Sequence, residues 1–263
     1  MASQDGPVER SAIEAALRRA LDDLVDGQLD VARKAVEATD DRWYGQLAAA
    51  SYAATADESD AEAVLSAATA TELLRAHSHL RSRLLVQLRG ERAHALTFEP
   101  SEALLAGDRL STAACASLDA DAHPAPEVGF AVLANAREAV TGTFADAYVG
   151  SGDPTPGQPS FFDGTGGTIG RGAAVLGATF AGVDEARREQ FAAVGRGLGT
   201  ATLIGRVLDR EPQEGMVAPP AFDESRLRDH AERRRKEGRQ ALADLSSRVD
   251  VEPIRQLDEG GRT

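Results

Sequence analysis

The fold is decided by residues 70–115, which read ATELLRAHSHLRSRLL (70–85), then LRGERAHALTF (88–98), then ALLAGDRLSTAAC (103–115). Leu, Ala and Arg, which are strong helix formers, dominate the first and last of these segments. The pattern predicts one long helix over 61–87 and another over 101–118. An interruption at 88–100 separates them and ends at Pro100, because a proline biases the residue before it away from the helical conformation. This stretch therefore predicts two helices and a connection.

Apolar residues keep the same three-and-four spacing in most of the remaining chain. Near the N-terminus, Ile13, Leu17, Leu21 and Leu24 recur on one face of a helix. The spacing predicts further helices over 8–27, from Asp30, and over 46–54, 127–149, 168–182, 184–208 and 223–247. Val, Ile and Thr never alternate with polar residues over the length of a strand. The sequence thus predicts an all-α fold, a single domain over 1–263 built as a bundle of about eight or nine helices.

One long segment, GSGDPTPGQPSFFDGTGG (150–167), interrupts the helical pattern. Loops of this length are uncommon in a compact domain unless they are functional lids or partly mobile. The overlapping stretch GTGGTIGRG (164–172) is only faintly similar to a phosphate-binding loop, since it lacks the G-K-[ST] ending and follows no strand. We therefore expect a lid or a flexible loop over 150–167 and no nucleotide site.

The chain is strongly acidic, with 42 acidic against 29 basic residues and a net charge of −13. Only Lys34 and Lys236 are lysines. Excess acid keeps a protein soluble through self-repulsion, which halophilic proteins exploit, so this composition favours a haloarchaeal source. A GC-rich genome is the alternative, and it explains the scarcity of lysine but not the excess of acid. No nucleic-acid partner is expected, because neutralising phosphates requires clustered Lys and Arg.

The compartment is indicated by cysteine usage and hydropathy. Cys115 is the only cysteine, which excludes an intramolecular disulfide and fits a reducing compartment. No uninterrupted apolar run approaches the roughly 18 residues of a membrane span. The N-terminal MASQDGPVER lacks both the basic start and the apolar core of a signal peptide. We expect a cytoplasmic protein without a membrane span.

The order of these segments resembles the central part of the trans-polyprenyl diphosphate synthases, which carry E-L-L-H-x-x-S-L-I-H-D-D-x-x-D, R-R-G-x-P-T and A-I-L-A-G-D. Glu72, Leu73, Leu74 and Ser78 stand at family positions, and Arg89-Gly90 is followed at the family's spacing by ALLAGD (103–108). Matches at packing positions extend the resemblance over roughly residues 40–210. The resemblance implies a helical bundle of the isoprenoid synthase type.

The resemblance also implies where chemistry should lie. The family's first aspartate motif binds magnesium, which bridges to the substrate diphosphate and takes up the charge of the leaving group. In this chain the three aspartate positions are Ser82, Arg83 and Val86. On a helix these residues fall within about one turn, yet none offers a carboxylate, and Arg83 would repel a cation.

The second aspartate motif, L-G-x-A-F-Q-I-x-D-D-I-L-D, is similar to LGTATLIGRVLDR (198–210). Its aspartates correspond to Arg206, Val207 and Arg210, and Asp209 is offset by one residue, which turns its side chain by about 100°. Both metal motifs are therefore eroded. The resemblance implies a degenerate family member, in which we expect no catalytic residue, no metal ligand and no magnesium cofactor.

A further family motif, G-K-x-x-R-P, belongs to the isopentenyl diphosphate site. It falls at residues 40–45, where Asp41 replaces the lysine and Tyr44 replaces the arginine. In R-R-G-x-P-T only Arg89 and Gly90 remain. The erosion implied by the resemblance thus reaches both substrate sites.

Arginines offer another way to hold a diphosphate, because guanidinium forks bind phosphate directly. The candidate ligands are Arg81, Arg83, Arg89, Arg206 and Arg210. If the fold holds, all of these except Arg89 are expected to cluster at the mouth of the cavity where the family binds metal. The alternative is that these arginines pair with Asp108, Asp146 or Asp209 and close an unused cavity, since buried charges are normally paired.

Two other groups of side chains have plainer interpretations. His77 and His79 are two residues apart and point to different sides of a helix, so even with His94 they do not make a convincing zinc site. We interpret them as surface or hydrogen-bonded histidines. The basic run RRRK (233–236) lies among acidic residues and predicts a solvated, salt-bridged helix face.

Three functions remain open from the sequence. The first is a non-catalytic polyprenyl synthetase-like protein that forms a homodimer, or a heterodimer with an active prenyl diphosphate synthase as its partner or regulatory subunit, because the family dimerises through its helices. The second is an active prenyltransferase with unusual site residues. The third is a protein that binds a prenyl diphosphate without metal.

Overall fold

The computed structural model describes residues 8–22, 30–39, 41–56, 60–88, 98–118, 126–149, 158–209, 223–247 and 249–260. In these ranges the regular secondary structure is helical, as the sequence predicts. The elements are α1 (Arg10–Asp22), α2 (Asp30–Glu37), α3 (Trp43–Ala53), α4 (Ala61–Leu88), α5 (Pro100–Ala116), α6 (Pro126–Tyr148), α7 (Pro159–Phe162), the π-helix η1 (Asp163–Gly167), α8 (Thr168–Phe180), α9 (Glu185–Asp209), α10 (Glu224–Leu245) and α11 (Glu252–Gly260).

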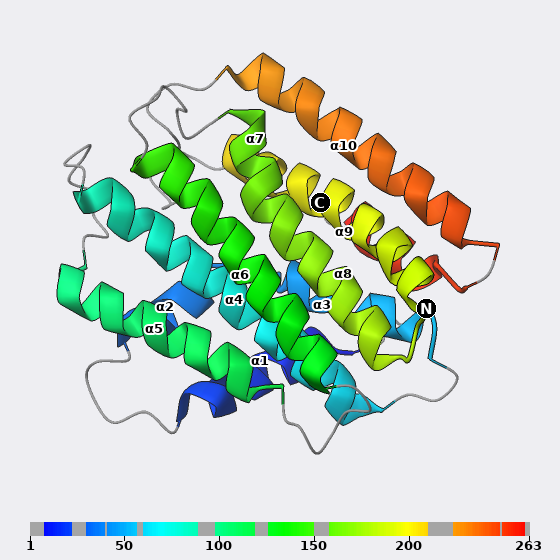
Figure 1. Ribbon diagram of the computed structural model, residues 1–263, viewed down its shortest axis with the longest axis horizontal. Coiled ribbons are helices and arrows are strands. Elements are labelled where there is room, and N and C mark those ends of the chain that lie inside the picture. Colours follow the sequence, from blue (N-terminus) through cyan, green and yellow to red (C-terminus); the bar gives the residue numbers. More distant parts are fainter. Residues whose placement is uncertain are drawn as a thin grey trace.

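The long helices run along one diagonal of the molecule (Figure 1). Contacts join them in the order α5, α4, α6, α8, α9 and α10, so that α5 and α10 lie at opposite edges of this layer. The short helix α3 packs against both α4 and α8. Nearly every residue of α3 and α8 is buried, as expected for helices that are apolar on all sides. These two helices form the centre of the core.

Helices α8 and α9 approach so closely that only glycine fits between their backbones. A Cβ atom on Gly170 would lie 2.2 Å from the carbonyl oxygen of Gly195, and one on Gly195 would lie 2.1 Å from the carbonyl oxygen of Gly170. Gly166 and Gly167, which were expected to lie in a loop, also pack against α9, since a Cβ atom on them would lie 2.6 Å from Leu203 and 2.5 Å from Thr200. Gly182 (φ 75°) then ends α8 in a left-handed conformation, with its N–H donating to the carbonyl of Thr179.

The predicted helices agree with the structure to within about three residues at each described end, but two expectations were wrong. Residues 158–167 do not form a loop, since they fold into α7 and η1, while 150–157 lie outside the described residues. Helix α11 was not anticipated. Ile254 inserts into the core and Asp258 pairs with Arg239 at 2.6 Å, so contacts with distant residues stabilise this short helix.

Among the helices of the described ranges, none is long and apolar enough to cross a membrane.

Candidate functional site

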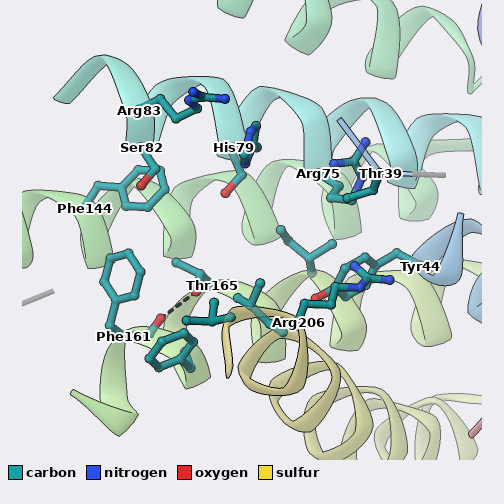
Figure 2. Close-up of a pocket in the computed structure, with 15 residues that line it drawn as sticks. Thr39, Tyr44, Arg75, His79, Ser82, Arg83, Phe144, Phe161, Thr165 and Arg206 are labelled. Atoms are coloured by element: carbon teal, nitrogen blue, oxygen red, sulfur yellow. Dashed lines mark hydrogen bonds between the residues drawn. The ribbon is translucent and has the colours of Figure 1, made fainter. Parts of the chain in front are cut away.

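A pocket lies between α4, α6, α8, α9 and the segment formed by α7 and η1 (Figure 2). Its volume is about 80 Å³, several times what one ordered water needs. The residues that line it come from five distant parts of the sequence. They are Thr39, Tyr44, Arg75, Ser78, His79, Ser82, Arg83, Phe144, Phe161, Phe162, Thr165, Ile169, Leu203, Arg206 and Val207.

The pocket is aromatic at one end and cationic at the other. Figure 2 shows Phe144 and Phe161 together at one end, and Arg75, Tyr44 and Arg206 toward the opposite end. The rings of Phe144 and Phe161 are 6.0 Å apart between centroids, a separation at which aromatic side chains attract each other. The pocket can therefore accommodate a ligand with an apolar part and an anionic part.

Arg75 is held firmly at the cationic end. Its Nε lies 2.7 Å from Oε2 of Glu72, one turn earlier on α4, and its Nη2 donates to the carbonyl of Val36. Glu72 is completely buried, and its Oε1 accepts the backbone N–H of Gly45 at 2.9 Å. Removing either charge would leave the other buried without compensation, so the pair fixes the position of both side chains.

Arg206, near the end of α9, lies at the same end of the pocket. Its Nη2 is 2.5 Å from Oδ2 of Asp41, and its guanidinium lies 5.5 Å from the centroid of the Tyr44 ring. The Tyr44 hydroxyl donates to the carbonyl of Gly199 at 3.3 Å, and burial raises the pKa of Tyr44 to about 12. Tyr44 is therefore neutral near pH 7, and Asp41 supplies the negative charge that Arg206 requires.

Ser82 and Arg83 line the aromatic end. The hydroxyls of Ser82 and Tyr148 are 3.2 Å apart, and the Arg83 guanidinium lies 5.9 Å from the centroid of the Phe98 ring. Desolvation lowers the pKa of Arg83, and no carboxylate of the described chain pairs with it. Figure 2 shows Arg83 at a distance from Arg206, so these two guanidinium groups do not converge on one point.

The structure brings together only part of the predicted site. Arg83 and Arg206 line the pocket, as do the eroded motif positions Ser82 and Val207. The expectation that Arg81 joins them needs correction, because Arg81 pairs with Asp108 at 3.1 Å and does not line the pocket. Val86 is buried in α4 and lies outside the lining as well.

Two of the predicted arginines, Arg89 and Arg210, lie outside the described residues. The alternative pairing of these arginines with acids holds for Arg81 and Asp108, whereas Arg206 pairs with Asp41, which the sequence did not suggest.

Sequence reasoning missed several of the lining residues. Arg75 could have been found, because it lies seven residues before Ser82 on the same helix, about two turns along one face. Phe161, Phe162 and Thr165 carried no such signal. Their segment was expected to be a loop, and only the packing of η1 against α9 places them at the pocket.

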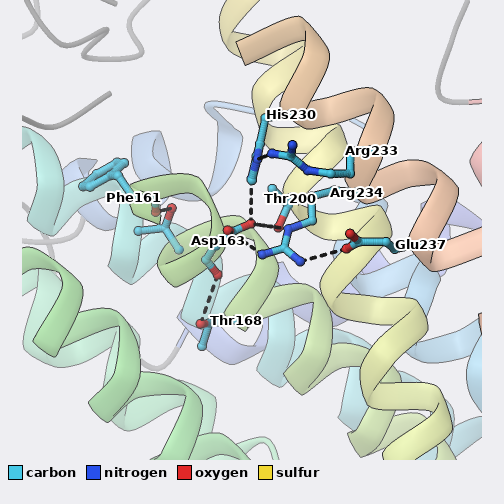
Figure 3. Close-up of polar contacts among 9 residues, drawn as sticks. Phe161, Asp163, Thr168, Thr200, His230, Arg233, Arg234 and Glu237 are labelled. Carbon is cyan, nitrogen blue, oxygen red and sulfur yellow. Dashed lines mark hydrogen bonds and ion pairs between the residues drawn. The ribbon is translucent and has the colours of Figure 1, made fainter. Parts of the chain in front are cut away.

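The segment that carries these residues is held in place by Asp163, the first residue of η1 (Figure 3). Its Oδ1 accepts hydrogen bonds from Thr200 on α9 (3.2 Å), His230 Nε2 (3.0 Å) and Arg234 Nε (2.8 Å), and its Oδ2 accepts one from Arg234 Nη2 (2.6 Å). One carboxylate therefore ties η1 to α9 and to α10. Because Phe161, Phe162 and Thr165 lie within two residues of Asp163, this contact sets the shape of one side of the pocket.

The charges around Asp163 favour its ionised form. Burial raises the pKa of Asp163, but the hydrogen bonds from Arg234 and His230 outweigh that effect and lower the pKa overall. The bond to Asp163 also raises the pKa of Arg234. Nη2 of Arg233 donates to Nδ1 of His230 at 2.6 Å, which leaves Nε2 of His230 to donate to Asp163. The basic run 233–236 is thus salt-bridged as predicted, but Arg234 is only partly solvated.

The histidines of α4 have separate environments. Nδ1 of His77 donates to the carbonyl of Gly107 at 2.8 Å, and desolvation lowers the pKa of this buried side chain. His79 instead lines the pocket. Within the described ranges, no group of three or more His, Cys, Asp or Glu side chains is arranged to hold a metal ion.

By sequence, the chain matches no family model and no curated protein. By structure, it is similar to trans-polyprenyl diphosphate synthases over almost its whole length. A geranyltranstransferase from Methanosarcina mazei superposes with a TM-score of 0.73 and 17% identity, covering 96% of this chain and 94% of that one. A geranylgeranyl pyrophosphate synthetase from the archaeon Geoglobus acetivorans gives a TM-score of 0.70 and 17% identity, covering 96% of each chain.

A third similar structure is the small subunit of geranyl diphosphate synthase from Antirrhinum majus. Its TM-score is 0.65 at 18% identity, and the alignment covers 96% of this chain and 95% of that chain. The described helices therefore have the all-α isoprenoid synthase fold that the sequence predicts.

Proposed function

We propose that this chain is a non-catalytic partner subunit of an active prenyl diphosphate synthase, whose stability or product length it sets. The fold supplies the scaffold of such an enzyme, while the side chains that the resemblance assigns to catalysis are replaced. Function depends on the groups at a site more than on the fold that carries them. The proposal therefore rests on the chemistry of the pocket and on the outer surface of the helices.

One observation carries the proposal: no described residue that lines the pocket is a carboxylate, and three of them are arginines. Magnesium requires hard oxygen ligands in near-ideal octahedral geometry, and carboxylates are the usual protein ligands. The Ser82 hydroxyl and the guanidinium groups of Arg83 and Arg206 do not fit such an ion. Leaving-group activation by magnesium, which the fold family implies, has no ligand set in this part of the molecule.

The outer surface of α5 and α6 supports a protein partner. Leu104 and Leu105 of α5 are 45% and 53% exposed, and Phe130 of α6 is 38% exposed. Most other exposed positions of α6 carry small or uncharged residues, among them Ala131, Ala134, Ala139, Gly142 and Ala145. Charged residues are depleted at the centre of protein interfaces, and four of the twelve exposed positions of α6 are charged. On α10, by contrast, exposed positions are mostly charged.

The Antirrhinum majus structure shows that a chain with this fold can be a subunit of a prenyl diphosphate synthase. We propose the same kind of assembly here, with the surface of α5 and α6 against an aspartate-bearing synthase of the same fold. An eroded site is compatible with such a role, because a subunit contributes through its interface and through the conformation it imposes on its partner.

Turnover assays test the loss of activity. The chain alone is incubated with isopentenyl diphosphate, an allylic primer and magnesium at high salt, since its acidic surface suggests a halophilic source. We expect no product above that of a heat-inactivated sample, and we expect a changed rate or product length when the chain is added to a synthase from the same host. Robust magnesium-dependent turnover by the chain alone would instead establish the alternative, an active prenyltransferase with unusual site residues.

A second candidate function, metal-independent binding of a prenyl diphosphate, is favoured by the polarity of the pocket. Arg75 and Arg206 lie at one end and Phe144 and Phe161 at the other, which suits an anionic head and an apolar chain. Arginine binds phosphate oxygens without a metal. This function is compatible with the first, because a subunit could hold a product or substrate of its partner.

A further inference from the structure

Arg42, which precedes α3, has an unusual backbone and an unusual environment. It is the only non-glycine residue of the described chain with a positive φ, at 49°. Its side chain is turned inward and the residue is only 6% exposed. A left-handed conformation is unfavourable for a residue with a Cβ atom and persists only where its surroundings enforce it. The fold therefore holds this guanidinium in a defined buried position.

Only one nitrogen of Arg42 is used by the described residues. Nη1 donates to the carbonyl of Val36 at 2.6 Å and to the carbonyl of Thr39, which caps the end of α2. Nε is buried without a partner, and both hydrogen bonds that the Arg42 side chain makes to described residues come from Nη1. The Nε–Nη2 edge of arginine is the fork that binds carboxylates and phosphates in a bidentate manner. In this protein Arg234 binds Asp163 through that same edge.

The other buried charges of the described chain have ionic partners. Glu72 pairs with Arg75 at 2.7 Å, and Asp258 pairs with Arg239 at 2.6 Å. Arg42 has no carboxylate within ion-pair distance among the described residues, although it is as deeply buried as these. Desolvation is accordingly the main cause that lowers the pKa of Arg42. A buried cation with an unused donor edge is stabilised by an anion placed against that edge.

Space for such an anion exists beside Arg42. A cavity of about 190 Å³ lies between α1 and α2, distinct from the pocket at α4 and α9, and Arg42 lines it together with Arg18 and Arg33. Two carboxylates also line the cavity. Glu14 is already compensated, since Arg10 lies 2.9 Å and Arg18 4.0 Å from its oxygens, and Glu37 is exposed to solvent. The lining carries three arginines against two carboxylates, and Arg33 also lies 3.4 Å from Asp30, so the net charge of the cavity walls is only +1.

We propose that this cavity is a binding site for a small oxyanion of the phosphate class, held by the Nε–Nη2 edge of Arg42 and by the exposed guanidinium groups of Arg18 and Arg33. The site stands independently of the proposed partner function, because it uses no residue of the pocket between α4 and α9. The carbonyl of Val36 joins the two regions, since it accepts hydrogen bonds from both Arg42 and Arg75. Binding of an oxyanion to Arg42 would therefore alter the hydrogen bond that Arg75 donates to this carbonyl.

Calorimetric titration with inorganic phosphate tests the site, at constant ionic strength with chloride as the replaced anion. The full-length chain is compared with R42K, which keeps the charge but removes the fork, and with the double variant R18Q/R33Q, which leaves the contacts of Arg42 to α2 untouched. R171Q, which removes an arginine that pairs with Glu189 and lines neither cavity, is the matched control, and R206Q reports any phosphate bound in the other pocket. Circular dichroism establishes that each variant is folded. If R42K does not fold, the phosphate affinity of R18Q/R33Q alone tests the proposal.

We expect saturable binding of one phosphate with a Kd of ~1 mM or tighter. Binding should be at least tenfold weaker in R42K and in R18Q/R33Q, and unchanged in R171Q. The proposal is overturned if no saturable heat is seen up to ~20 mM phosphate. It is equally overturned if R42K and R18Q/R33Q bind as the wild type does, or if R206Q alone abolishes binding, since the anion would then lie elsewhere.

Discussion

Asp41 and Arg206 form an ion pair of 2.5 Å although 165 residues separate them in the sequence. The resemblance places a lysine at the first position and an aspartate at the second, so the two charges are exchanged in this chain. Arg206, which stands at an aspartate position, pairs with Asp41, which stands at a lysine position. Opposite charges therefore still meet after the exchange. The pair gives Arg206 a counter-charge at the cationic end of the pocket.

The first prediction concerns ligand binding at this end of the pocket. In the presence of EDTA, geranylgeranyl diphosphate should bind the wild type, and R206Q should weaken binding at least tenfold, because it removes a guanidinium at the cationic end. Tryptophan fluorescence or calorimetry measures the affinity. R81Q is the matched control, since Arg81 pairs with Asp108 outside the pocket and its loss should leave the affinity unchanged. No binding at millimolar ligand would exclude this second function.

The second prediction concerns the buried pair of Glu72 and Arg75. Replacing Glu72 by Gln leaves Arg75 buried without its counter-charge, and the free energy of unfolding should fall by about 3–5 kcal/mol. Urea denaturation at fixed salt measures this change. Glu62→Gln, on the exposed first turn of the same helix, should cost less than about 1 kcal/mol. Equal effects of the two substitutions would contradict the role assigned to the buried pair.

The third prediction concerns the carboxylate that fixes η1. Asp163→Asn removes the charge shared by Arg234 and His230 and should lower the free energy of unfolding at pH 7 by about 2 kcal/mol. Because the folded-state pKa of Asp163 lies below its ordinary value of 3.8, its contribution is full above that pH and is lost as the pH falls below it.

The stability difference between wild type and Asp163→Asn should therefore be constant near neutrality and narrow below pH 3.8. Urea denaturation of both proteins at several pH values measures this difference in the free energy of unfolding. Asp146→Asn, an exposed position on α6, should change stability by less than about 0.5 kcal/mol and serves as the control. A difference that grows as the medium becomes acidic would have the wrong sign for this account.

The fourth prediction separates two glycines in helices. Gly170→Ala places a Cβ 2.2 Å from a backbone oxygen of α9, so the helices must move apart, and stability should fall by about 3 kcal/mol. Gly142→Ala meets nothing within 4 Å and should raise stability by about 0.5–1 kcal/mol, because alanine is the better helix former. Thermal denaturation of the two variants checks the opposite signs.

The sequence was sufficient to predict most of the helices and the fold. Apolar periodicity located α5, α6, α9 and α10, because each of these helices buries one side over several turns. It failed at Gly166 and Gly167, which were expected to lie in a loop. A single sequence does not reveal that another backbone passes within contact distance, and this approach is what makes glycine necessary there.

The candidate site was only partly predictable for the same reason. The motif positions of the resemblance pointed to Ser82, Arg83, Arg206 and Val207, and these residues line one pocket. The pairing of Asp41 with Arg206 was not predictable. It depends on the tertiary contact between the start of α3 and the end of α9, which no local pattern encodes.

Affinity purification of the tagged chain from its own host at high salt, read by mass spectrometry, tests the partner function. We expect an aspartate-bearing prenyl diphosphate synthase to be recovered in near-equal amount. Ala134→Arg, which places a charge at the exposed middle of α6, should abolish its recovery while leaving the chain folded. Recovery of the chain alone, with or without that substitution, would contradict the partner function.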